Sequence, residues 1–136
     1  MRFIQKLPDN FQKDENKFYI GIVGSRKVND YEFVKSIFLK VIESVIFFDN
    51  IVIVSGGAKG VDSIAKQISK NLGISIIEII PDWSIGKQAG ILRNSEIVKI
   101  IDFLIAIPTK DSIGTYDTIR KAKQKLIPTI IKEYKL

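Results

Sequence analysis

The residues of this chain that can do chemistry are glycines, hydroxyls, arginines and carboxylates. The segment "VSGGAKGVDSIAKQ", residues 54–67, places three glycines between an apolar run and a helical pattern. Glycine lacks a Cβ, so an anion can approach backbone N–H groups at the N-terminus of the helix that follows. A tight strand-to-helix turn would favour the same glycines without a ligand. The segment alone therefore leaves both interpretations open.

Histidine and cysteine are both absent from the 136 residues. Without them the chain has no Ser-His-Asp triad, no Cys-His pair, no disulfide and no zinc site built from imidazole or thiolate. We expect neither a metal nor a cofactor. The net charge of +6 favours anionic partners such as nucleotides or nucleic acid, although lysines scattered over a solvated surface would give the same charge.

The elements that must position these residues alternate between strands and helices. The first helix is expected to begin after Asp30, with an apolar stripe that includes Val34, Phe38 and Val45. Further helices are expected at 61–72, at about 90–100 and at 115–126. Apolar runs predict five strands, at 18–23, 51–55, 74–80, 102–107 and 128–133.

This alternation predicts an α/β fold: a doubly wound, Rossmann-like and mainly parallel five-stranded sheet with helices on both faces. The strands lack polar alternation, as expected when both faces of a sheet are covered. Residues 1–17 are polar and aperiodic, so we expect an N-terminal arm before a single domain of residues 18–136. No apolar run could cross a membrane and no signal peptide is evident, so we expect a cytoplasmic protein.

In such a fold, the loops after the strands meet at one edge of the sheet, where ligands bind. Those loops are "GSR", "SGGAKG", "PDWSIGKQAG" and "TKDSIGT". Arg26 and Arg93 can each hold a phosphate through two parallel hydrogen bonds. Trp83 can stack on a base or cover the core. Asp62 can bind a ribose hydroxyl or complement the dipole of its helix.

The segments "GSRKVND", "VSGGAKGVDSIAKQ", "PDWSIGKQAGILRN" and "SIGTYDTIRKAK" together resemble the SLOG superfamily over residues 18–132, and most of all its small YspA-like branch. That superfamily includes the DNA-processing protein A family, which binds single-stranded DNA. It also includes the lonely-guy family, which hydrolyses the N-glycosidic bond of nucleoside monophosphates, and sensor domains that bind NAD-derived signals. The resemblance implies a nucleotide or nucleotide sugar in the pocket built by the glycine loops.

We expect residues from all four loops to bind this ligand, and we assign none of them a catalytic role. The expected ligand-binding residues are Gly24, Ser25, Arg26, Ser55, Gly56, Gly57, Ala58, Gly60, Asp62, Trp83, Lys87, Arg93, Asn94, Ser112, Gly114 and Thr115.

The first hypothesis is a protein that senses or sequesters a ligand such as ADP-ribose, cyclic ADP-ribose or NAD, for instance as a phage counter-defence sponge. One alternative is an N-glycosidase that uses Asp62, Glu96 or Asp117 as its acid or base. The lonely-guy pattern ends in a glutamate where this chain has Thr118, which argues against cleavage by that mechanism. The other alternative is single-stranded nucleic-acid binding.

Relatives of this fold commonly self-associate, so we expect a homodimer or tetramer. The apolar residues Phe38, Phe47 and Phe48 are candidates for its interface.

Overall fold

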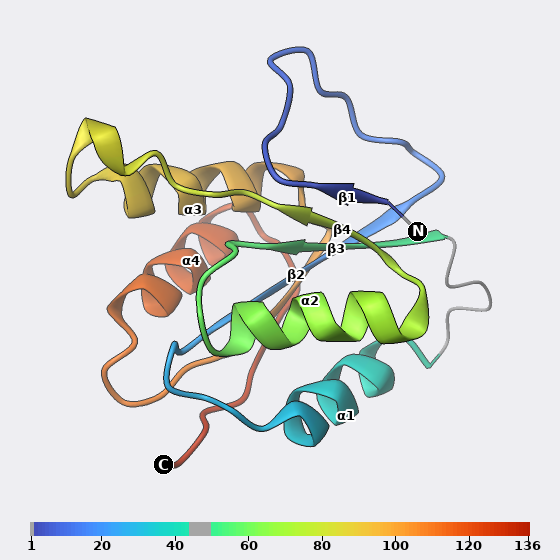
Figure 1. Cartoon of the computed structure of the whole chain (residues 1–136), viewed down its shortest axis with the longest axis vertical. Coiled ribbons are helices and arrows are strands. Elements are labelled where there is room, and N and C mark those ends of the chain that lie inside the picture. Colours follow the sequence, from blue (N-terminus) through green and yellow to red (C-terminus); the bar gives the residue numbers. More distant parts are fainter. Residues whose placement is uncertain (1, 44–49) are drawn as a thin grey trace.

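The computed structural model describes residues 2–43 and 50–136, and all structural statements below concern those residues (Figure 1). The chain begins with two strands, after which helices and strands alternate, and a short 3-10 helix, η2, precedes the third helix. The elements are β1 (Phe3–Ile4), β2 (Phe18–Gly24), α1 (Tyr31–Val41), β3 (Ile51–Ser55), α2 (Val61–Leu72), β4 (Ser75–Glu78), η2 (Trp83–Ile85), α3 (Ala89–Ile100), β5 (Phe103–Ile107), α4 (Ile113–Gln124) and β6 (Thr129–Ile131).

The strands form one sheet in the order β1-β4-β3-β2-β5-β6, and every neighbouring pair is parallel. From the central strand β2 the chain builds outward through β3 and β4, and then crosses back to β5 and β6 on the other side. The strand order therefore reverses between β2 and β5. This topology confirms the predicted doubly wound, Rossmann-like α/β fold.

The sheet has one strand more than the five expected, because the N-terminal arm contributes β1 at the edge beside β4. Phe3 pairs with Ile76 there, and the Ile76 N–H donates to the Arg2 carbonyl at 2.8 Å. Two residues are too short to give a periodic signal, so only the pairing with β4 identifies this strand. The division into an arm of residues 1–17 and a domain of residues 18–136 stays a prediction.

The helices cover both faces of the sheet, with α1 and α2 on one face and α3 and α4 on the other (Figure 1). Alternate residues of β2 serve the two layers: Ile20 and Ile22 pack with α1 and α2, whereas Tyr19 and Val23 pack with α3 and α4. Both sets are buried, which explains the strand's lack of polar alternation. No helix in the described ranges is both long and apolar enough to span a membrane.

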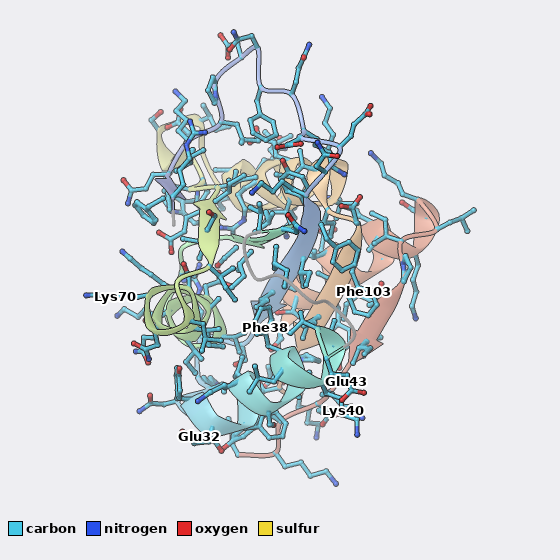
Figure 2. The ribbon with its side chains drawn as sticks, turned by 90° about the vertical axis from the view of Figure 1, so that its right-hand side faces the viewer. Glu32, Phe38, Lys40, Glu43, Lys70 and Phe103 are labelled. Atoms are coloured by element: carbon cyan, nitrogen blue, oxygen red, sulfur yellow. The ribbon has the colours of Figure 1, made fainter. Side chains whose placement is uncertain are left out.

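Helix α1 begins as predicted, because the Asp30 carboxylate accepts a hydrogen bond from Phe33 N–H at 3.1 Å. The prediction that Phe38 contributes to an association surface is wrong. Its side chain is fully buried under α1, while Lys40 lies exposed on the outer side of the same helix (Figure 2). The helix ends at Val41, and the expected continuation to Val45 falls outside the described residues, as do Phe47 and Phe48.

Candidate functional site

A cavity of about 370 Å³ lies at the carboxyl ends of β2, β3 and β5, around the point where the strand order reverses. Open α/β sheets bind their ligands at this position, and small-molecule sites have volumes of roughly 300–1,000 Å³. Most of the predicted ligand-binding residues line it: Gly24, Ser25, Arg26, Gly56, Ala58, Asp62, Arg93, Asn94, Ser112, Gly114 and Thr115.

The other predicted residues belong to the same loops or to their ends but do not line the cavity. Ser55 is buried at the end of β3, and Gly57 and Gly60 belong to the loop before α2. Trp83 and Lys87 are exposed in the segment between β4 and α3, and 55% of the Trp83 side chain is accessible to solvent. Stacking of Trp83 on a base therefore stays a prediction.

Several lining residues were not singled out in the sequence. Lys27 follows Arg26 in the loop after β2, and Thr109 and Asp111 belong to the loop after β5. These three residues lie in loops that were predicted to converge, and this was the sequence signal that could have identified them. Thr118 on α4 also lines the cavity, and the sequence singled it out only as the residue at the position of the lonely-guy glutamate. The remaining new members are Val23, Ile97 and Ile113.

Ser25 connects three of the elements around the cavity. Its N–H donates to the Ile107 carbonyl at the end of β5 at 3.0 Å, and its carbonyl accepts from Val61 N–H at the start of α2 at 3.1 Å. Its hydroxyl oxygen accepts from the Thr109 hydroxyl at 2.9 Å and from Lys27 N–H at 3.0 Å. Ser25 is buried, so these bonds are shielded from water and fix the relative positions of β2, β5 and α2.

The N-terminus of α4 enters the cavity without a side-chain cap. Ser112 occupies the N-cap position, but its hydroxyl accepts from Thr109 N–H at 2.9 Å and makes no capping bond to α4. Gly114 and Thr115 in the first turn line the cavity, and a Cβ added to Gly114 would meet nothing within 4 Å. Unsatisfied first-turn N–H groups and the helix dipole make such an end attractive to anions.

Two backbone N–H groups of the glycine loop "SGGAKG" form hydrogen bonds within the protein. Gly57 N–H donates to the Ser55 hydroxyl at 3.4 Å, and Ala58 N–H donates to the Asp62 carboxylate at 3.1 Å. Gly60 has a φ of +73°, and an added Cβ would lie 2.2 Å from the Ser25 carbonyl oxygen. Gly60 is therefore required by backbone packing between this loop and the loop after β2.

Asp62 is a buried carboxylate in the first turn of α2. Burial raises its pKa to about 6, although the Ala58 N–H hydrogen bond and the nearby positive charge of Arg93 act in the opposite direction. Burial also raises the pKa of Glu78 at the end of β4. No group of three or more carboxylates within the described ranges is placed to hold a metal ion.

Arg93 is held by backbone carbonyls on the side of the cavity formed by β3 and β4. Its Nη1 donates to the Gly56 carbonyl at 2.5 Å and to the Ile79 carbonyl at 3.4 Å, and its Nε donates to the Asn94 side chain at 3.0 Å. Burial lowers its pKa, the charge of Asp62 raises it and that of Arg26 lowers it further. The guanidinium thus contributes positive charge from a fixed position.

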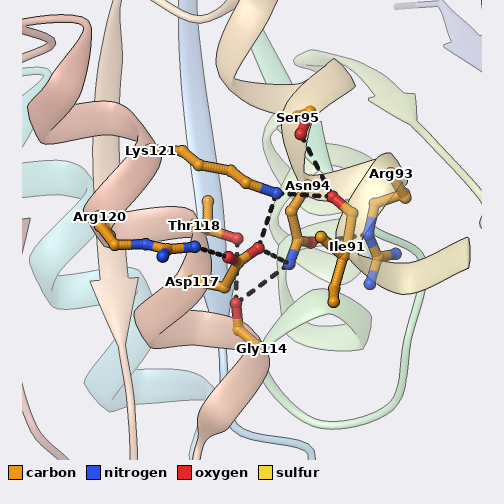
Figure 3. Close-up of polar contacts among 9 residues, drawn as sticks. All are labelled: Ile91, Arg93, Asn94, Ser95, Gly114, Asp117, Thr118, Arg120 and Lys121. Atoms are coloured by element: carbon orange, nitrogen blue, oxygen red, sulfur yellow. Dashed lines mark hydrogen bonds and ion pairs between the residues drawn. The ribbon is translucent and has the colours of Figure 1, made fainter. Parts of the chain in front are cut away.

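Asn94 links α3 to the N-terminal part of α4 (Figure 3). Its side-chain amide donates to the Gly114 carbonyl and to the Asp117 carboxylate, both at 3.2 Å. Asp117 also pairs with Arg120 and, at 2.9 Å, with Lys121. Burial would raise the pKa of Asp117, but hydrogen bonds from Lys121 and Asn94 and the neighbouring positive charge hold it below its usual value. These contacts fix the position of the uncapped helix end relative to α3.

Comparison with known proteins identifies relatives of this chain. The family model described as DNA recombination-mediator protein A matches residues 10–85, which is more than half of the chain. Gene 61 protein of Mycobacterium phage D29 is 37% identical over 87 residues, which cover 59% of this chain and 70% of the phage protein.

Solved structures share the fold at low sequence identity. DNA processing protein A from Helicobacter pylori, which binds single-stranded DNA, superposes with a TM-score of 0.62 at 19% identity, covering 90% of this chain and 68% of that one. The protein TM1055 gives a TM-score of 0.60 at 18% identity, covering 82% of this chain and 72% of that one. DNA processing protein A from Streptococcus pneumoniae gives 0.53 at 19% identity, covering 85% and 59%. The predicted place of this chain in the SLOG superfamily is confirmed.

Substitution of Gly60 tests the packing of the two loops. Gly60→Ala should lower the free energy of unfolding by ~3 kcal/mol or more, because the new Cβ overlaps the Ser25 backbone in a conformation that other residues avoid. Gly73→Ala is the matched control, because Gly73 has a φ of +69° and open space around it, and should lose only ~1 kcal/mol. Urea denaturation measures both, and equal losses would contradict the packing argument.

Substitution of Asp62 tests the cost of its burial. The pKa of Asp62 is raised from 3.8 to about 6 by folding, so the folded protein loses stability as the pH rises between those values. Asp62→Asn removes that loss, so the variant should be the more stable protein at pH 7.5. Between pH 4 and pH 7.5, its free energy of unfolding should rise relative to that of the intact protein by up to ~3 kcal/mol. Urea denaturation of both proteins across this range is the measurement. A stability difference independent of pH would show that Asp62 titrates normally.

Proposed function

Because this chain belongs to the DNA recombination-mediator protein A family of the SLOG superfamily, we propose that its cavity binds a nucleotide-derived ligand through a phosphate. The observation that carries the proposal is the uncapped N-terminus of α4, which enters the same cavity as the side chains of Arg26 and Lys27. A helix end of this kind and two cations form a site for an anion of small volume.

The cations have different parts in this proposal. Arg26 and Lys27 are exposed on the loop after β2. Their side chains are therefore able to close over a bound phosphate, and Arg26 can donate two parallel hydrogen bonds to it. Arg93 already donates to backbone carbonyls, so its main contribution is electrostatic. The first-turn N–H groups of Gly114 and Thr115 complete the phosphate site.

Ligand candidates are ADP-ribose, cyclic ADP-ribose and NAD, together with the simpler nucleotide AMP. A volume of about 370 Å³ suits a ligand of nucleotide size, with larger ligands extending past the exposed loops. The protein would sense such a ligand or sequester it. A phage protein among its relatives supports the second role, in which the protein acts as a sponge.

Binding without turnover is the version that the side chains favour. Thr118, which stands at the position of the lonely-guy glutamate, lines the cavity and donates its hydroxyl to the Gly114 carbonyl at 3.2 Å. Asp117 is engaged with Asn94, Arg120 and Lys121. Glu96 is exposed on α3 and does not line the cavity. Self-association as a homodimer or tetramer also stays a prediction, and its candidate residues Phe47 and Phe48 lie outside the described residues.

Single-stranded DNA binding is the second candidate function. The observation that favours it is the similarity in fold to the DNA-binding protein of Helicobacter pylori, and the net charge of +6 agrees with it. In this version the cavity would hold one phosphate of the strand, and exposed lysines would contact its neighbours.

Calorimetric titration with ADP-ribose, cyclic ADP-ribose, NAD and AMP tests the first candidate. At least one of them should bind, and Arg26→Ala should weaken its binding about tenfold or more, since hydrogen bonds to charged groups contribute ~1.5–3 kcal/mol. Lys70→Ala is the control, because it also removes a positive charge, but Lys70 lies in the last turn of α2, at the end of that helix away from the cavity. Absence of binding by all four nucleotides would refute the proposal.

A gel shift with short single-stranded oligonucleotides across a salt series tests the second candidate. Binding through several phosphates should weaken steeply as salt rises. An affinity that exceeds that for the nucleotides and depends strongly on salt would favour DNA as the ligand. Absence of a shift at low salt would eliminate this candidate.

A further inference from the structure

The cavity contains a carboxylate whose hydrogen-bonding capacity is only partly used. Asp62 lines the cavity, and 5% of its surface is exposed. Its Oδ2 accepts from Ala58 N–H at 3.1 Å, whereas its Oδ1 has no hydrogen-bond partner within the described residues. Leaving a buried acceptor unpaired is costly, so an unpaired carboxylate oxygen at a ligand cavity requires an explanation.

Neighbouring charges do not supply the missing partner. Arg93 from α3 and Glu78 from β4 are the charged side chains that act on Asp62, and Glu78 is itself acidic. The Arg93 guanidinium donates to Gly56, Ile79 and Asn94 instead. Asp62 takes part in none of the ion pairs described within residues 2–43 and 50–136, which join Lys13 to Asp102 and Arg120 and Lys121 to Asp117. The neutral neighbour is the Ser55 hydroxyl, whose hydrogen bond lowers the pKa of Asp62 but leaves Oδ1 without a partner. Oδ1 therefore has capacity for a donor that arrives with the ligand.

The position of Asp62 suggests which part of the ligand it meets. Asp62 follows β3 and the α4 N-terminus follows β5, and these two strands flank β2. Adjacent strands are ~4.8 Å apart, so the two ends of the site are separated by roughly 10 Å before side chains extend into the space between them. The buried carboxylate of Asp62 repels phosphate more strongly than that of Asp111, which lines the α4 end but is exposed to solvent and therefore screened. The phosphate should therefore lie at the α4 end, and the group bonded to it should extend toward Asp62.

In a nucleotide, the group bonded to the phosphate is the sugar, and its donors are hydroxyls. A cationic donor is disfavoured because the cavity lining already has three cations, Arg26, Lys27 and Arg93, against the two carboxylates Asp62 and Asp111. We propose that Asp62 accepts a hydrogen bond from a ribose hydroxyl, so that the cavity selects ribonucleotides over nucleotides that lack this hydroxyl. This inference rests on the proposed phosphate site at α4, and it names the class of ligand that the site accepts.

The test compares AMP with 2′-deoxy-AMP and 3′-deoxy-AMP by calorimetric titration. The intact protein should bind AMP about tenfold or more tightly than at least one deoxy analogue, because that analogue leaves Asp62 unpaired. In Asp62→Asn, the side-chain oxygen can still accept from Ala58 N–H, but an NH₂ donor then replaces Oδ1. The variant should therefore bind AMP and the analogue with nearly equal affinity.

The control variant is Glu96→Gln, which removes one negative charge from the exposed surface of α3 outside the cavity and should keep the preference for AMP. Denaturation curves of each variant establish that it is folded at the temperature of titration. Equal binding of all three nucleotides by the intact protein would overturn the inference and leave the proposed phosphate site standing. If ADP-ribose binds and AMP does not, Asp62→Asn should weaken ADP-ribose binding about tenfold or more, and an unchanged affinity would overturn the inference. Absence of binding by any nucleotide would refute the phosphate site itself.

Discussion

The cavity depends on the buried hydrogen bonds of one small residue, Ser25. Its backbone connects the end of β5 to the start of α2, and its hydroxyl accepts from Thr109. The Ser112 hydroxyl in turn accepts from Thr109 N–H and makes no capping bond to the first turn of α4. The same set of contacts that holds the loops together thus exposes the helix end that we assign to phosphate.

The site combines a rigid part with an adjustable part. Arg93, Asn94 and Asp117 are fixed by contacts between α3, α4 and the ends of β3 and β4. Arg26 and Lys27 are exposed on a loop whose backbone is fixed but whose side chains can move. Asp62 lowers the stability of the folded protein at neutral pH, because its burial opposes ionisation. A group that lowers the stability of the empty protein and lines its cavity is typical of a binding site.

Much of this arrangement could be predicted from the sequence, but the roles that depend on contacts between distant residues could not be predicted from periodicity. Apolar runs and helical spacing predicted the five main strands and four helices, and parallel topology then required the loops to converge. The sequence could not show that Gly60 serves backbone packing, because that role depends on the Ser25 carbonyl, far away in the chain. The inward direction of Thr109 likewise depends on tertiary contacts. The burial of Phe38, by contrast, agrees with the helical stripe that it shares with Val34.

The N-terminal strand β1 has a consequence for the behaviour of the protein in solution. It pairs with β4, whose outer backbone would otherwise present unpaired N–H and C=O groups along the border of the sheet. Exposed edge strands readily pair with strands of other molecules and can start the growth of an intermolecular sheet. Two paired residues, assisted by the Arg2 carbonyl, cover part of that border. Pairing with β1 therefore leaves fewer backbone groups of β4 available to strands of other molecules.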